Sequence, residues 1–449
     1  MIAFLTLHEW RLLTRSAVVR VVAAVFTASL AAASLLGAAR VAREQRTHDA
    51  FAARAEQQRR QVAAVRADVI ANERGWLALL PPSPLAALAA GQSDVHPAYL
   101  KVTARNLDAL VTGDQVEHPL AVASGHFDAA FVILFLYPLL ILAVSFDLTA
   151  TERERGPLRM VLAQPVRLRD VVAGKMIARW VLLAVPAVVI PMLGVISGEP
   201  AVMVMWSLAV LAYGSIWHGI ALVVNARGGN AATNALVLAG IWLLFVIVGP
   251  ATINLAIALR YPMPSRVEAA IQARAATQDA SVQGSRDLGQ FLQDHPTSAN
   301  IGRDGMRQFA VLQAVREKQI VDRLEAVESA FERQLERQQR LASWLRVLSP
   351  TMAAQAVLLD LAGTGTSRFD HFESAAEAFQ QEWKAYFEPR VLDAATVTRE
   401  EIVAAPRFAY HDEPAAAAAS RAAIIVASMA IAGAVLVWIG IRQYRGYRL

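Results

Sequence analysis

Uncharged apolar stretches alternate with charged segments along the whole chain. The first stretch, Val21–Ala39, lies between Arg20 and Arg40 and holds 19 uncharged residues. As a helix it reaches roughly 28 Å, enough to cross the hydrocarbon core of a bilayer. Five later stretches have the same character, so the pattern predicts an all-α membrane protein with six transmembrane helices. The predicted spans are 17–39, 129–146, 180–198, 200–226, 231–256 and 422–441.

The first residues have a different pattern, in which apolar and charged positions are interleaved. Phe4, Leu5 and Leu12 alternate with Glu9 and Arg11, among others. This spacing is typical of an amphipathic helix in the headgroup region, and it is too polar for a cleaved signal sequence. We therefore expect an interfacial helix over 1–16.

Basic residues in the short connections predict the orientation, because positive charge favours the cytoplasmic side. They precede the first span, lie between the second and third and between the fourth and fifth, and follow the sixth. The termini, including the tail 442–449, are therefore expected in the cytoplasm. Two large, mostly helical inserts, 40–128 and 260–421, are expected outside it.

Both inserts carry helical periodicity. In the first insert a stripe is formed by Phe51, Ala55, Val62, Val65 and Val69. In the second insert Ile320, Leu324, Val327 and Phe331 form a heptad-like seam. The segment 349–362 is again amphipathic, and we expect it along the membrane surface.

The loop 147–179, between the second and third spans, contains signals for two helices. Gly156 tolerates a left-handed helix cap, and Pro157 is preset for the first turn of the next helix. That short helix should end before Pro165. Asp170 is the expected N-cap of the helix that follows.

This loop resembles the first cytoplasmic loop of ABC-2-type transporter permeases, in which E-R-E-x-G-T-L-x-x-L-L-x-x-P precedes a G-K pair. The chain differs from that pattern at Pro157, where threonine is usual. The candidate coupling residues of this loop are Glu152, Arg153, Glu154, Gly156, Pro157, Leu158, Leu162, Pro165, Gly174 and Lys175. The resemblance implies that the loop is a coupling helix that docks into a separate ATPase subunit. The alternative is an ordinary basic loop that only fixes topology.

Further phrases resemble a subfamily of these permeases with two large extracytoplasmic inserts and a domain of unassigned function. They are A-L-A-A-G-Q-S-D-V-H-P at 87–97, Y-P-M-P-S-R at 261–266 and L-A-G-T-G at 361–365. The resemblance implies a bacterial inner-membrane complex with two copies of the ATPase, which bind ATP and Mg²⁺. It also implies a second permease copy or a sister permease, and a periplasmic protein is a further candidate partner.

Composition and absent motifs limit the other classes. The chain is 55% hydrophobic with a mean hydropathy of +0.37 and lacks cysteine, which argues for an integral membrane protein. Its net charge is only +5 and its basic residues are scattered along the chain, so we expect no nucleic-acid partner. It has no phosphate-binding loop of its own, since Met176 follows Gly174-Lys175. We expect neither catalytic residues, nor a bound cofactor, nor a metal site; His118 and His126 are a weak pair. The chain by itself is predicted not to be an enzyme.

Polar residues inside the spans form a candidate intramembrane site. They are His218 in the fourth span and Asn234 and Asn254 in the fifth. Such residues either lie on a substrate path or dimer seam, or form hydrogen bonds to neighbouring helices.

Two functions follow from these features. In the first, the chain is a permease subunit that couples ATP hydrolysis by a partner to the movement of a substrate. In the second, the same loop drives the inserts mechanically against a periplasmic partner, and no solute crosses. The sequence specifies neither the substrate nor the direction of transport.

Overall fold

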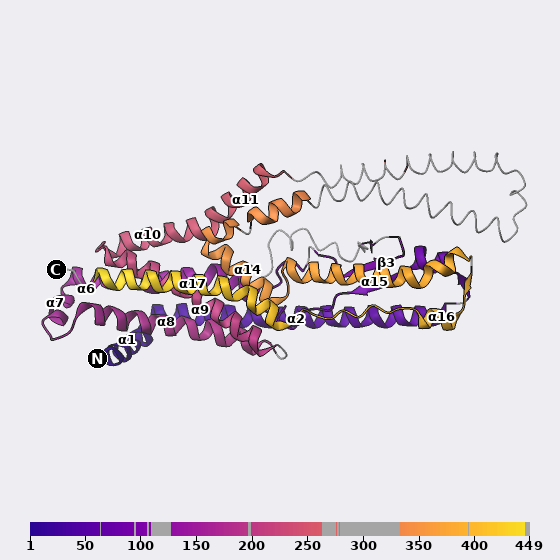
Figure 1. The fold of residues 1–449 in the computed structure, drawn as a ribbon. Helices are drawn as coiled ribbons and strands as arrows, with labels where there is room; N and C mark the ends of the chain where they lie inside the picture. Colours follow the sequence, from indigo (N-terminus) through magenta and orange to yellow (C-terminus); the bar gives the residue numbers. More distant parts are fainter. Residues whose placement is uncertain are drawn as a thin grey trace, which may run out of the picture.

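The computed structural model describes residues 1–62, 64–93, 96–105, 107–108, 127–195, 199–262, 275, 278, 333–342, 344–393 and 395–444. Several predicted features lie outside these residues. They are the seam at 320–331, His118, His126 and residues 445–449. The described chain is elongated, with helices running along its length (Figure 1).

Within the described residues, six helices are long and apolar enough to cross a membrane, which agrees with the predicted number and indicates a multi-pass membrane protein. The first is α2 (Ala17–Gln61), and the second comprises α4 (Ala129–Phe131), η3 (Val132–Leu136) and α5 (Tyr137–Ser145). The third and fourth are α8 (Leu168–Leu193) and α9 (Pro200–Ala226). The fifth comprises α10 (Ala231–Trp242), η4 (Leu243–Val248) and α11 (Gly249–Arg260), and the sixth is α17 (Ala415–Gln443).

Two spans change their winding immediately before a proline. The π-helical turn η3 precedes Pro138, and the π-helical turn η4 precedes Pro250. Proline has no N–H, and its ring crowds the carbonyl four residues earlier, so a wider turn relieves the clash. The spans therefore remain helical through both prolines.

The first span is far longer than predicted. Helix α2 continues without a break to Gln61, and its 45 residues reach roughly 68 Å. The predicted apolar stripe is wrong beyond this point, because Val65 lies in strand β1 (Val65–Arg66) and Val69 in the π-helical turn η1 (Val69–Arg74). One rigid helix thus joins the membrane bundle to the polar part of the chain.

Parts of the two predicted inserts, the described residues of 40–108 and 366–414, form one structure, which we call the polar unit. Strand β1 pairs with β5 (Thr396–Val397), with Val65 opposite Val397. Strands β2 (Trp76–Leu79), β3 (Tyr99–Val102) and β4 (Leu107–Asp108) form an antiparallel sheet. The all-α expectation is therefore too simple, although helices dominate.

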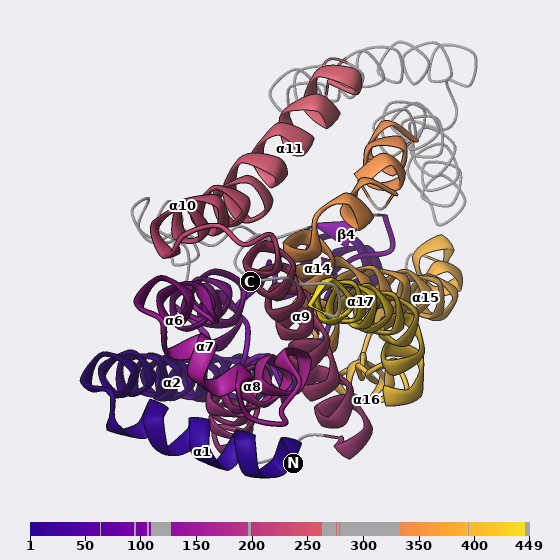
Figure 2. The same ribbon diagram turned by 90° about the vertical axis from the view of Figure 1, so that its left-hand side faces the viewer.

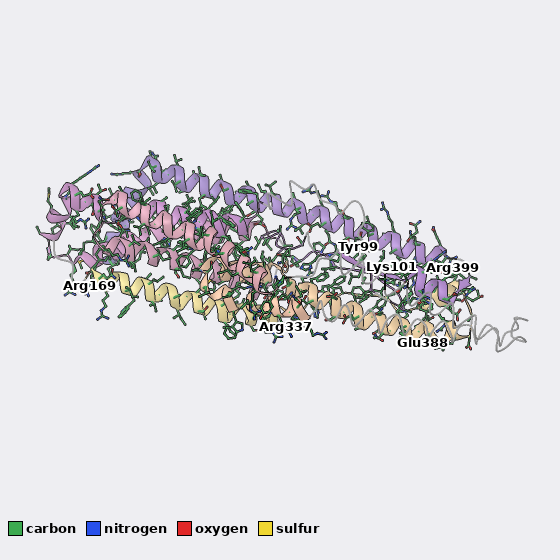
Figure 3. All side chains as sticks on the ribbon, turned by 90° about the horizontal axis from the view of Figure 1, so that it is seen from above. Tyr99, Lys101, Arg169, Arg337, Glu388 and Arg399 are labelled. Atoms are coloured by element: carbon green, nitrogen blue, oxygen red, sulfur yellow. The ribbon has the colours of Figure 1, made fainter. Side chains whose placement is uncertain are left out.

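One hydrophobic core unites the polar unit. Ile70 and Val102 from the first insert pack with Phe372, Phe379 and Trp383 of α15 (Thr366–Leu392) in this core. Strands this short are stable only against such a partner. Figure 3 shows Tyr99, Lys101, Glu388 and Arg399 in this half of the molecule and Arg169 at the opposite end.

Arg59 ties the end of α2 into the same unit. Its Nε donates to the carbonyl of Ile402 at 2.7 Å and its Nη2 to that of Val403 at 2.9 Å, in α16 (Arg399–Ala404). The guanidinium also lies over the Trp76 ring, 4.6 Å from its centroid. Since these contacts bind α2 to both inserts, the polar unit is fixed to the first span.

The segment expected along the membrane surface lies inside the bundle instead. Helix α14 (Pro350–Ala362) packs against α9 and α17, with Val357 and Leu358 buried in the same core as Trp206 of α9. Thr351 Oγ1 lies 3.0 Å from Tyr213 Oη, and Ser349 Oγ donates to the carbonyl of Phe245 at 2.9 Å. Its alanines explain the difference, because small side chains permit close helix packing.

Candidate coupling site

The loop between the second and third spans lies at one end of the molecule, together with α1 (Ile2–Arg15) and the end of α17 (Figure 1). It consists of α6 (Ala150–Arg155), Gly156, α7 (Pro157–Leu162) and a short turn that leads into α8. Gly156 has φ 94° and ψ −20°, which confirms the predicted left-handed cap. We call residues 147–167 the hinge.

The start of α8 differs from the prediction. The helix begins at Leu168, so Asp170 lies in its first turn and is not its N-cap. Leu168 is buried with Leu158 and Val172 in a small core at the hinge, and this packing stabilises the extra turn. Residues 171–179 are helical and lead into the third span, as predicted, so the helix only starts three residues earlier than expected.

Lys175 holds α6 against α8. Its Nζ lies 2.6 Å from Glu152 Oε1 and donates to the carbonyl of Leu148 at 2.9 Å. The Lys175 side chain is buried, whereas that of Glu152 is 39% exposed. The lysine therefore joins the third span to the chain just after the second one.

Two further contacts fix the base of the hinge. Arg153 Nη2 donates to the carbonyl of Gly229, in the connection between α9 and α10, at 2.8 Å. Asn225 of α9 accepts from the Leu148 N–H at 3.1 Å and donates to the carbonyl of Ser145 at 2.9 Å. The base of the hinge is thus hydrogen-bonded to α8, to α9 and to the connection before the fifth span.

The tip of the hinge has the opposite character. Glu154, Pro157, Met160 and Pro165 are exposed, and the Met160 side chain is 74% exposed. Leu158 on the other side of α7 is buried. The side chains of Arg159 and Leu162 lie outside the described part of the structure. An exposed thioether among charged residues is typical of an adaptable binding surface.

Seven of the ten motif residues therefore fall into two groups. Glu152, Arg153, Leu158 and Lys175 hold the hinge together from inside. Glu154, Pro157 and Pro165 face outward with Met160. Met160 is a candidate contact that the motif does not mark.

Helix α1 packs on α8 beside the hinge. Glu9 Oε1 lies 2.7 Å from Arg179 Nη1, and both side chains are almost fully buried. Arg179 Nε also donates to the carbonyl of Val144 at 2.8 Å. Sequence analysis missed this pair, although Lys175 and Arg179 stand one helical turn apart at the edge of an apolar stretch.

Gly174 permits the close approach of α1. A Cβ at this position would lie 2.9 Å from the Leu5 Cβ and 3.2 Å from the Thr6 nitrogen. Figure 2 views the molecule from this end, where α1 lies across the direction of the spans and beside α8. The Gly174-Lys175 pair thus has two structural roles, one toward α1 and one toward α6.

The candidate intramembrane residues do not form one site. Asn234 Nδ2 donates to Asn225 Oδ1 at 3.2 Å, next to the hinge, and the buried His218 Nδ1 lies 2.9 Å from the carbonyl of Gly214 in its own helix. Asn254 is exposed on α11. For Asn234 this agrees with the structural alternative, hydrogen bonding to neighbouring helices.

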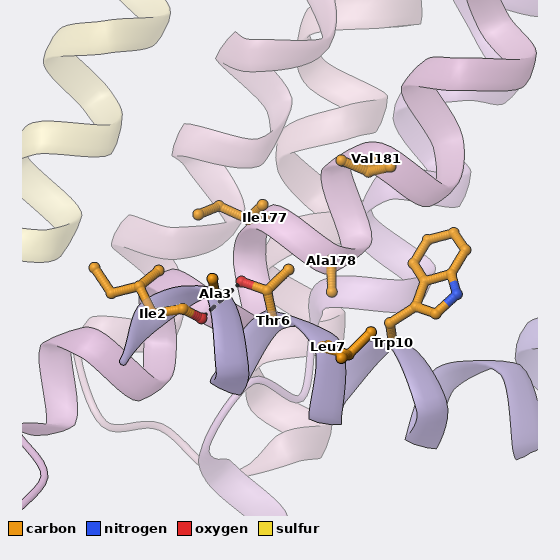
Figure 4. A pocket seen from close by; sticks show the side chains of 8 residues that line it. All are labelled: Ile2, Ala3, Thr6, Leu7, Trp10, Ile177, Ala178 and Val181. Carbon is orange, nitrogen blue, oxygen red and sulfur yellow. Dashed lines mark hydrogen bonds between the residues drawn. The ribbon is translucent and has the colours of Figure 1, made fainter.

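Within the described residues, no group of three or more histidine, aspartate or glutamate side chains is placed to hold a metal ion. A groove lies between α1 and α8 at this end, as Figure 4 shows. Its lining is almost entirely apolar.

A comparison with known protein families gives a match. Residues 266–411 match the family described as a domain of unknown function (DUF3526). The matched region includes α14 in the bundle and α15 and α16 in the polar unit. No curated protein matches the chain. The match covers the second insert and assigns no activity.

Proposed function

We propose that the chain is the permease subunit of an ABC-2-type ATP-driven transporter in the cytoplasmic membrane of a bacterium. The hinge carries this proposal. Its base is hydrogen-bonded to α8 and α9, and its tip presents Glu154 and Met160 to solvent. A rigid base beneath an exposed tip is the arrangement that a docking element needs in order to pass a displacement to membrane helices.

In this proposal the tip contacts a separate ATPase subunit, which binds ATP and Mg²⁺. Two ATPase copies would require two hinges, and hence a second permease copy or a sister permease. The hinge end would face the cytoplasm, and the polar unit would face the periplasm. Displacement of α6 and α7 would reach α8 through Lys175 and α9 through Asn225.

The test is to isolate the complex from native membranes and measure ATP hydrolysis with tip variants. We expect Glu154→Lys and Met160→Asp each to lower the permease-dependent ATPase rate about tenfold, the order of effect of a single interface anchor. Membrane insertion should be unchanged, because neither side chain is buried. Glu388→Lys, an exposed charge reversal in the polar unit, is the matched control and should have no effect. Normal stimulation in both tip variants would contradict the proposal.

A second candidate function is mechanical transmission to a periplasmic partner. The observation that favours it is the continuity of α2, which runs from the bundle to the point where Arg59 holds α16. A tilt of the first span would therefore move the whole polar unit. The two candidates share the docking step and differ in solute flux, which reconstituted vesicles with the complete complex would measure.

A further inference from the structure

The groove between α1 and α8 is lined almost entirely by apolar side chains. It is a largely open groove with a volume of about 610 Å³, comparable with ligand sites of ~300–1,000 Å³. Thr6 is its one hydroxyl residue, and that hydroxyl donates to the carbonyl of Ile2 at 3.1 Å. Figure 4 shows the lining residues Ile2, Ala3, Thr6, Leu7 and Trp10 of α1 and Ile177, Ala178 and Val181 of α8.

The two helices that form the groove are fixed relative to each other. The buried Glu9–Arg179 pair and the close contact of Leu5 with Gly174 lie along the same helix pair. The groove is therefore a built feature of this packing and does not depend on a mobile side chain.

The groove continues onto the exposed apolar surface of a span. Ile177 lines it and is 44% exposed, and Val185 and Val189 follow Val181 at one-turn spacing along α8, both exposed. A flexible hydrocarbon chain can follow such a path from the groove along the helix, whereas a folded partner would need a broader face. This geometry favours a lipid tail as the occupant.

The charges of α1 indicate which lipid fits. Its one acidic side chain, Glu9, is buried against Arg179. Its other charged side chains, Arg11 and Arg15, are both basic and exposed. Arg11 follows Leu7 by four residues, so it lies on the same flank of the helix as the groove. The rim thus presents positive charge without a compensating acid from α1.

We propose that this groove binds an anionic phospholipid. One acyl chain occupies the space between α1 and α8, and the phosphate headgroup lies toward Arg11 and Arg15. This lipid-binding site is separate from the hinge tip, where we propose that an ATPase docks.

Trp10 provides a reporter for the test, because it lines the groove. The full-length chain is placed in phosphatidylcholine vesicles that contain increasing fractions of brominated phosphatidylglycerol or of brominated phosphatidylcholine. The Trp10 contribution is the difference in fluorescence quenching between the wild-type chain and Trp10→Phe. We expect half-maximal quenching at about a tenfold lower fraction of the anionic lipid, given the attraction of two arginines for an anionic headgroup.

Two variants separate the parts of the proposal. Arg11→Gln with Arg15→Gln should abolish the preference while quenching by both lipids persists. Ala3→Phe should fill the groove and weaken Trp10 quenching by both lipids, whereas Leu12→Phe, on the exposed side of α1, should change neither. Equal quenching by the two lipids in the wild-type chain would overturn the proposal, as would a preference that survives the double arginine variant. The assay needs no ATPase, so its outcome is independent of the proposed transport function.

Discussion

Replacing Arg179 with leucine should release α1 from α8. The substitution leaves the buried Glu9 carboxylate without its partner and removes the hydrogen bond to the carbonyl of Val144. Breaking a buried ion pair costs ~3–5 kcal/mol, because the remaining charge stays desolvated. Hydrogen exchange of residues 2–15 should therefore accelerate about a hundredfold or more in the purified chain.

The control for this prediction is Arg20→Leu, which changes an exposed arginine of α2 just after α1 and should leave exchange nearly unaltered. Glu9→Leu combined with Arg179→Leu should restore part of the protection, since no unpaired carboxylate remains. Unchanged exchange in Arg179→Leu would mean that the pair does not hold α1.

Replacing Lys175 with methionine should uncouple the hinge from α8. Methionine keeps the apolar stem but cannot donate to Glu152 or to the carbonyl of Leu148. The local loss should be ~1–3 kcal/mol, because the carbonyl loses a partner while Glu152 retains access to water. In the complete complex, permease-dependent ATP hydrolysis should fall about tenfold, whereas the bound ATPase subunit should remain.

Arg155→Met is the matched control, because Arg155 is an exposed cation at the end of α6. It should leave ATP hydrolysis within about twofold of the wild-type rate. Lys175→Met with normal hydrolysis would show that the lysine supports the fold without transmitting motion.

The features that the sequence predicted correctly depend on local chemistry. The six spans follow from uninterrupted apolar stretches, and the turn at Gly156 follows from a residue that alone adopts positive φ without strain. Both signals are contained in short windows of sequence. Neighbouring residues were therefore enough to locate the spans and the hinge.

The features that the sequence did not predict depend on contacts between distant residues. Val65 is paired with Val397 in a two-stranded sheet, and Glu9 forms an ion pair with Arg179. No periodicity within one segment specifies such a partner. The union of the two inserts into one polar unit and the burial of α14 both arise in this way.

The start of α8 illustrates the same limit at a smaller scale. Asp170 is a good N-cap by residue type, but burial of Leu168 with Leu158 moves the helix start forward. Tertiary packing outweighs a capping preference of ~1 kcal/mol.

The long α2 helix connects the membrane bundle to the polar unit. At one end it lies in the bundle with Phe26 and Leu30 buried, and at the other Arg59 binds α16. A change at the hinge would reach the polar unit through contacts of α2 with α5 and α8. Transport and mechanical transmission are both compatible with this connection.

The central claim is that the hinge tip docks on an ATPase in the cytoplasm. The most direct measurement places a photo-activated cross-linking amino acid at position 160, whose native methionine is 74% exposed, and irradiates intact cells. The same group at position 388, in the polar unit, is the control. The account predicts a covalent adduct between position 160 and a nucleotide-hydrolysing subunit and none from position 388. Labelling of a single cysteine at position 160 (Met160→Cys) by a membrane-impermeant thiol reagent from outside the cell would contradict it.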